Sequence, residues 1–100
     1  MPQEQRVYEV WHAVPADFSA ERPISDFPRG FEMVAAVLSE DLDEVFDKTN
    51  HAHRPWTENE GVSPKVQRPR STSVGDVVVD VVRATAHRVE IVGWSTKERG

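Results

Sequence analysis

The densest group of polar side chains in the sequence lies at 70–76, where three hydroxyl residues follow an arginine and precede a Gly-Asp pair. The hydroxyl residues are Ser71, Thr72 and Ser73. Such hydroxyls, and the carboxylate of Asp76, commonly accept hydrogen bonds from the backbone N–H groups of a turn. This predicts a turn that leads into the apolar run after it. Together with Arg70, the same groups could instead form a small pocket for an anion or a peptide carboxylate.

A serine nucleophile in this segment would need a base, and His87 is the candidate that the chain offers. Nucleophilic serines are activated by an adjacent base, and in one large class of hydrolases the serine stands in a Gly-x-Ser-x-Gly turn. The residues around Ser71 and Ser73 lack that pattern. The sequence therefore favours a structural turn over a hydrolase site.

Two histidines, His51 and His53, follow a predicted helix that carries Asp47 in its last turn. Imidazole and carboxylate groups are zinc ligands. However, Asp47 and His51 share a helix face only if the helix continues to His51, and the helix dipole favours histidines at this end without a metal. The pattern favours no metal site and no cofactor, and these three residues are the weak candidates for one.

The segment 51–73 is the expected surface for a partner. Trp56 could cover the core as a lid or stand exposed as an anchor, since aromatic residues and arginine dominate interface energetics. Lys65, Arg68 and Arg70 could contact a protein or phosphate groups. Three cations in a chain of net charge −5 make a weak footprint for nucleic acid. A protein partner is therefore favoured, with a nucleic acid as the alternative.

These residues must be positioned by a small number of elements. β-branched and aromatic residues cluster between prolines and glycines in 6–14, 31–38, 76–82 and 87–94, which predicts four strands. A helix would also accept most of 31–38, but the short length of this run favours a strand. The last two strands are expected to form an antiparallel hairpin.

A helix is predicted from Asp41 to about Asn50. With Asp41 as the N-cap, Glu44 lies three residues later, which is the spacing of a capping box. The apolar stripe of the helix would be formed by Leu42, Val45, Phe46 and Thr49. The segments 15–30 and 51–70 are expected to be long loops, with Phe18, Ile24 and Phe27 of the first packed back against the core, and 96–100 is expected to be a frayed tail.

The predicted fold class is α+β, with a mostly antiparallel four-stranded sheet, one packed helix and two long loops. One hundred residues suffice for one domain, with an ordered core over about 6–95. No apolar run approaches the roughly 20 residues of a membrane span, and the first residues lack the apolar stretch of a signal peptide. The absence of cysteine excludes disulfides and thiolate sites. A cytoplasmic location is expected, and a homodimer is left open.

The later segments resemble the YodL-like domain, a family found in small proteins and in polyvalent proteins of bacteria, phages and conjugative elements. The likeness covers about 41–94 and depends on the helix that ends at Asn50, on Arg-Ser-Thr-Ser-Val-Gly-Asp-Val-Val at 70–78, and on a final strand ending Gly-Trp. The chain departs from the family pattern at Thr49, where an aromatic residue is commoner, and at Trp94, which replaces a phenylalanine. The resemblance implies an α+β fold and a mobile-element setting, without a reaction.

Taken together, these patterns predict a small non-enzymatic binding or regulatory protein that acts through protein–protein contacts. The candidate contact residues share the 51–73 segment: Trp56, Arg68, Arg70, Ser71, Thr72 and Ser73. A hydrolase or a metal-dependent enzyme is the least favoured class.

Overall fold

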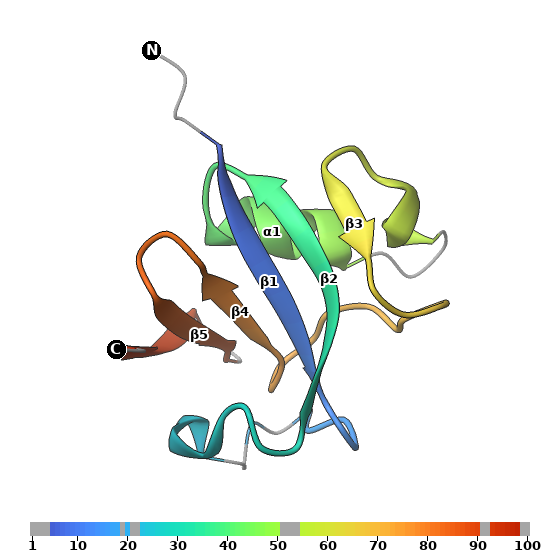
Figure 1. Ribbon diagram of the computed structural model, residues 1–100. Coiled ribbons are helices and arrows are strands. Elements are labelled where there is room, and N and C mark those ends of the chain that lie inside the picture. The colour runs from blue at the N-terminus through green and yellow to red at the C-terminus, as the bar shows by residue number, and fades with distance from the viewer. Residues whose placement is uncertain (1–4, 19, 21–22, 51–54, 91–92, 99–100) are drawn as a thin grey trace.

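The computed structural model describes residues 5–18, 20, 23–50, 55–90 and 93–98. These described residues form two 3-10 turns, one α-helix and six strands. In chain order they are β1 (Arg6–Ala13), η1 (Ile24–Asp26), β2 (Phe31–Ser39), α1 (Leu42–Thr49), η2 (Trp56–Glu58), β3 (Val62–Pro64), β4 (Val77–Asp80), β5 (Thr85–Val89) and β6 (Trp94–Glu98). The strands form one sheet in the order β3-β2-β1-β4-β5-β6, and all neighbouring strands are antiparallel (Figure 1).

The predicted α+β class, with one helix and an antiparallel sheet, is confirmed, but the prediction of four strands is wrong. The segment 87–94 was expected to be one strand, whereas β5 ends at Val89 and β6 begins at Trp94. The turn between them is closed by a hydrogen bond from the Glu90 N–H to the Gly93 carbonyl, and Gly93 has a φ of 73°. Strand β6 therefore occupies part of the expected tail.

The other unpredicted strand is β3, which lies inside the segment 51–70 that was expected to be a loop. It has three residues and ends at Pro64, so its length and composition give little strand signal. Its partner is the β2 edge, where Ala36 lies opposite Ser63. The ambiguous segment at 31–38 forms β2, as predicted.

Strand β1 lies in the middle of the sheet, between β2 and β4, and apolar side chains occupy both of its faces. Val10 lies opposite Ala35 of β2 on one side and opposite Val78 of β4 on the other. Alternation along the strand directs Tyr8 and Val10 to the face covered by α1, and Trp11 to the opposite face. Both faces of the sheet are therefore part of the core.

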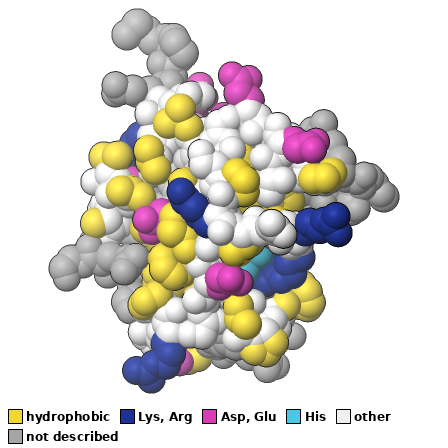
Figure 2. All heavy atoms as spheres, turned by 45° about the vertical axis from the view of Figure 1, so that its right-hand side comes forward, with side chains coloured by type: hydrophobic (Ala, Val, Ile, Leu, Met, Phe, Trp, Pro, Cys, Tyr) yellow, Lys and Arg dark blue, Asp and Glu magenta, His cyan; other side chains and the backbone are white. Residues whose placement is uncertain are grey.

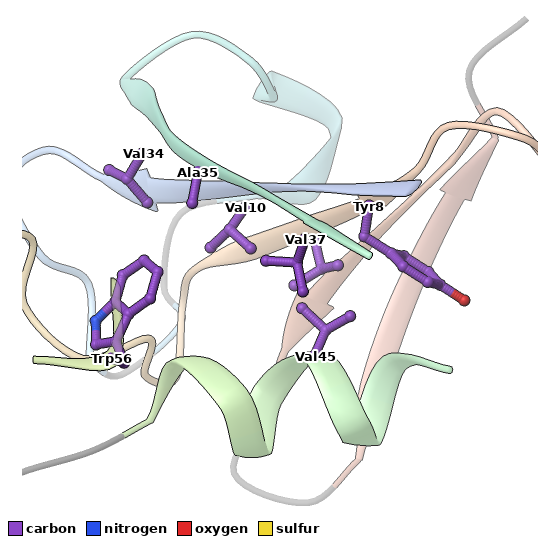
Figure 3. Close-up of a cluster of buried hydrophobic side chains, with 8 residues drawn as sticks. Tyr8, Val10, Val34, Ala35, Val37, Val45 and Trp56 are labelled. Atoms are coloured by element: carbon purple, nitrogen blue, oxygen red, sulfur yellow. The ribbon is translucent and has the colours of Figure 1, made fainter. Parts of the chain in front are cut away.

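Helix α1 covers one face of the sheet through Val45, which is fully buried (Figure 3). Asp41 is its N-cap, as predicted, and accepts a hydrogen bond from the Glu44 N–H at 2.8 Å. Figure 3 places Tyr8 beyond one end of the helix and Trp56 beside the other end. Tyr8 and Trp56 belong to the same buried cluster as Val45.

The opposite face of the sheet is covered by the segment that connects β1 to β2. Phe27 is buried there and its ring packs edge-on against Trp11, with ring centroids 5.3 Å apart. Phe18 of the same segment is 62% exposed, so the prediction that it packs against the core is wrong. No helix among the described residues has the length and apolar character needed to cross a membrane.

Candidate functional site

Asp76 is the centre of the polar segment that the sequence singled out. Its side chain is fully buried and accepts backbone hydrogen bonds from Ala13 at 2.9 Å and from Ser73 at 2.8 Å. The Arg70 guanidinium contacts both carboxylate oxygens, at 2.6 and 2.7 Å. A buried carboxylate needs such partners, because an unpaired charge in the interior is strongly unfavourable. The predicted turn is therefore a corner that Asp76 holds together.

Arg70 makes several contacts within this corner. Besides pairing with Asp76, its guanidinium donates to the carbonyls of Ala13 at 3.1 Å and Ser71 at 3.1 Å. The exposed ring of Phe18 lies 5.7 Å from the guanidinium carbon. Arg70 therefore has a structural role, because its charge is compensated by a buried carboxylate. Its predicted contact with a partner stays a prediction.

The hydroxyl groups of Thr72 and Ser73 serve the same corner. Thr72 is fully buried, and its hydroxyl lies 3.0 Å from Nε2 of His12. The Ser73 hydroxyl donates to the Ser71 carbonyl at 3.2 Å. The Thr72 backbone is also tied to the end of α1, through its N–H to the Thr49 carbonyl and its carbonyl to the Asn50 amide. Both hydroxyls therefore take part in hydrogen bonds within the corner.

His12, Thr72 and Asp76 lie together but are not arranged as a catalytic triad. In a triad the acid contacts one ring nitrogen and the nucleophile the other. Here the Asp76 carboxylate is 3.9 Å from the same Nε2 that contacts the Thr72 hydroxyl. Burial lowers the pKa of His12 to about 4, and the nearby Arg70 also lowers it, against the opposing effect of Asp76. His12 is thus a neutral core residue.

His87 does not serve as a base for the serines either. It lies on β5, where its Nε2 contacts the Thr85 hydroxyl at 2.8 Å and its Nδ1 contacts the Thr96 hydroxyl at 2.9 Å. Both ring nitrogens are therefore occupied by threonines. The pairing of Ser71 or Ser73 with His87 that the residue order allowed is not formed.

Gly75 is required by the approach of another segment to the corner. Its φ is 93°, and a Cβ at this position would stand 2.0 Å from the Asp17 carbonyl oxygen. Only glycine combines this backbone conformation with that close contact. The segment after β1 is thereby held against the start of β4.

Trp56 is a core residue and not a surface anchor. It is 2% exposed, and its indole N–H donates to the Arg70 carbonyl at 2.9 Å. Its ring lies beside His12, with ring centroids 6.1 Å apart. The lid interpretation is correct, and contact with a partner through the indole is excluded by this burial.

An open groove of about 420 Å³ lies beside the corner, between the end of β1, the start of β2 and the segment 66–70. Val14, Val66 and Pro69 supply apolar walls, and Glu32 and Arg68 supply charges. Val14 is 54% exposed. In the view of Figure 2, apolar, basic and acidic side chains are interspersed, and a histidine is visible beside basic side chains. The groove is therefore amphipathic.

Arg68 is the predicted contact residue that the structure places at the groove in an available state. Its side chain is exposed, and no described residue pairs with its guanidinium. Its φ of 49° is in the left-handed region, which is unfavourable for a residue with a side chain. Lys65 is also exposed in the same segment. Sequence reasoning missed Val14 and Glu32, for which only the nearby Pro15 and Gly30 were signals of a strand end.

The candidate metal ligands are not brought together by the described part of the chain. His51 and His53 lie outside the described residues, and Asp47 is exposed on α1. Within the described ranges, no three His, Cys, Asp or Glu side chains gather in a way that could hold a metal ion. Comparisons with protein-family models, with curated proteins and with solved structures return no match.

Proposed function

We propose that this chain is a small non-enzymatic binding protein that docks on a partner protein through the groove beside Arg68. The observation that carries the proposal is an exposed arginine, held in an unfavourable backbone conformation, at the edge of an open groove with apolar walls. Strained backbone conformations cluster at functional sites when the surrounding structure maintains them. The partner's matching surface is an apolar side chain with a carboxylate beside it.

The apolar part of the groove provides the anchor position. Val14, Val66 and Pro69 offer surface that an inserted side chain would remove from water, at about 25 cal/mol per Å² of apolar area. Arg68 then provides the charged contact at the rim, where a partner carboxylate would pair with it bidentately. Glu32 on the opposite side disfavours a second carboxylate there.

The corner beneath the groove supports this role because it limits movement of the binding surface. Arg70 bridges Asp76 and the Ala13 carbonyl, and Trp56 is bonded to the Arg70 backbone. Both walls of the groove are thus attached to one buried network. A preorganised surface loses less conformational entropy when it binds.

The setting that we propose is cytoplasmic, in an accessory protein of a phage or a mobile element. It depends on the resemblance of 70–78 to the YodL-like pattern. The buried, neutral His12 and the doubly bonded His87 support a non-enzymatic role. With Arg70 paired to Asp76, Lys65 and Arg68 are the cations left for phosphate groups in the predicted basic loop, which favours a protein over a nucleic acid.

The test is capture of a partner by tagged protein from a lysate of the source cells, with variants on the groove. Arg68→Glu and Val14→Asp should each lower recovery of the same partner by about tenfold or more, as expected for hot-spot residues. Arg29→Glu is the matched control, since Arg29 is an exposed arginine beyond the groove. Equal recovery by wild type and both groove variants, with their circular dichroism unchanged, would refute the proposal.

A further inference from the structure

A second cleft lies at the start of α1 and is lined by Tyr8 and Leu42 among others. Figure 3 shows Tyr8 near the end of the helix that is away from Trp56. The volume of the cleft is about 400 Å³, within the range of small-molecule sites. The lining residues come from three stretches of the chain, which are β1, the start of α1, and the run from the end of β4 to the start of β6. Stretches that are distant in sequence therefore converge on one space, and none of these lining residues lines the groove at Arg68.

The sheet side of this cleft is rich in hydrogen-bond donors. Arg6 donates to the Tyr8 hydroxyl oxygen at 2.7 Å and lies 3.5 Å from Asp80, in both cases through Nη2. Its Nε is buried without a hydrogen-bond partner among the described residues. Arg83 lies 3.9 Å from Asp80 and is 68% exposed. Two cations thus share one buried carboxylate, which leaves an excess of positive charge on this side.

Tyr8 forms the buried floor of the same side, because the residue is only 1% exposed. Its hydroxyl oxygen accepts a hydrogen bond from Arg6 and so helps to hold that guanidinium at the cleft. Burial raises the pKa of Tyr8, which keeps this hydroxyl protonated. Burial also lowers the pKa of His87, which keeps that imidazole neutral. The donor side therefore fits a carboxylate.

The helix side of the cleft has the opposite charge and an apolar surface. Asp41 and Asp43 stand at the start of α1, and the Asp43 carboxylate accepts a hydrogen bond from the Trp94 indole N–H at 3.2 Å. Leu42 and the half-buried Trp94 line the cleft between the two charged sides. Each carboxylate keeps further acceptor positions. This side fits an ammonium group, with an aliphatic chain against Leu42 and Trp94.

We propose that this cleft binds a small zwitterion of the amino-acid class. The carboxylate of the ligand contacts Arg6 and Arg83, and its ammonium group contacts Asp43. The two opposite charges of the cleft explain the choice, since a simple anion would meet the aspartates and a simple cation would meet the arginines.

The experiment uses three probes with the same five-carbon chain: 5-aminopentanoate, pentane-1,5-diamine and pentanedioate. Binding to the whole chain is followed through the Trp94 indole N–H signal in ¹H–¹⁵N spectra, which Trp94→Phe identifies. The zwitterion should shift this signal at millimolar concentration and bind at least about fivefold more tightly than either other probe. No shift with the zwitterion, or equal affinity for the diamine or the diacid, would overturn the proposal.

Two exposed variants separate the two sides of the cleft without disturbing the core. Arg83→Gln should weaken binding of the zwitterion by about threefold, and Asp43→Asn should do the same. The controls are Arg29→Gln and Asp47→Asn, which remove equal charges outside the cleft. Unchanged affinity in both cleft variants would also overturn the proposal. The outcome is independent of partner capture through Arg68, because neither cleft variant lines that groove.

Discussion

The substitution Asp76→Asn should destabilise the protein more than any other change of a single polar atom in the corner. The asparagine has the same shape but loses the charge that Arg70 pairs with at 2.6 and 2.7 Å. Its amide nitrogen also replaces one oxygen that accepts from a backbone N–H, so either the Ala13 or the Ser73 N–H loses its acceptor. Two buried interactions therefore fail together.

The magnitude follows from these two losses. Breaking a buried ion pair costs about 3–5 kcal/mol, and the low end applies because the Arg70 side chain is 32% exposed and can be rehydrated. A buried N–H without an acceptor costs about 1 kcal/mol or more. The sum is about 4 kcal/mol, a large part of the roughly 5–15 kcal/mol that stabilises a domain. The melting temperature should fall by on the order of 15–25 °C.

The assay is urea unfolding followed by circular dichroism, with two comparison variants. Ser73→Ala should cost about 1 kcal/mol or less, because Asp76 binds the Ser73 backbone N–H and not its hydroxyl. Asp47→Asn, at an exposed site on α1, should stay within about 0.5 kcal/mol of wild type. If the free energy of unfolding of Asp76→Asn lies within about 1 kcal/mol of the wild-type value, the corner does not contribute to stability as the two lost interactions imply.

Three further predictions concern the surroundings of this corner. Gly75→Ala should lower the free energy of unfolding, measured in urea, by more than about 3 kcal/mol, because its Cβ would meet the Asp17 carbonyl. The control is Gly93→Ala, which is also at positive φ but has open space around it and should lose only about 1 kcal/mol. Equal losses of stability in the two variants would contradict the contact with Asp17. The free energy of unfolding should fall by up to about 3 kcal/mol as the pH drops from about 6.5 toward 4, because the unfolded chain protonates His12 at its ordinary pKa and the folded chain only near 4. His12→Gln should flatten this dependence between pH 6.5 and 5, apart from the smaller effect of His87, and a slope unchanged in that variant would rule out His12 as its source. Trp56→Ala should lower the free energy of unfolding by about 3–5 kcal/mol, as measured by the same assay, whereas a surface anchor would leave it unchanged.

Much of the fold could be predicted from local patterns. The N-cap at Asp41 and the β-branched run at 77–79 act through neighbouring residues, and both elements formed, although the strand predicted over 76–82 ends at Asp80. The strand count failed where the signal is not local. Strand β3 forms through its pairing with the edge of β2. Strand β6 begins after a turn at Gly93, a residue that the sequence places within an apolar run and that was therefore assigned to a strand.

The candidate site was predictable in its residues but not in their roles. The Ser-Thr-Ser-Val-Gly-Asp sequence predicted a turn. The pairing of Arg70 with Asp76 also depends on the end of β1, where the Ala13 N–H bonds to Asp76 and the Ala13 carbonyl bonds to Arg70. Likewise, Trp56 is buried because it covers His12 and bonds to the Arg70 carbonyl. These contacts depend on chain segments about 60 residues apart, such as His12 with Thr72, which no local pattern encodes.

Amide hydrogen exchange at Ala13 and Ser73 tests most directly whether the buried carboxylate organises the second half of the chain. Both N–H groups donate to Asp76 although neither bond belongs to the strand ladder. Their exchange should be as slow as that of the residues in the middle of β1, and should become much faster in Asp76→Asn. Exchange at the rate of exposed loops in the wild-type protein would contradict the structural role of the corner.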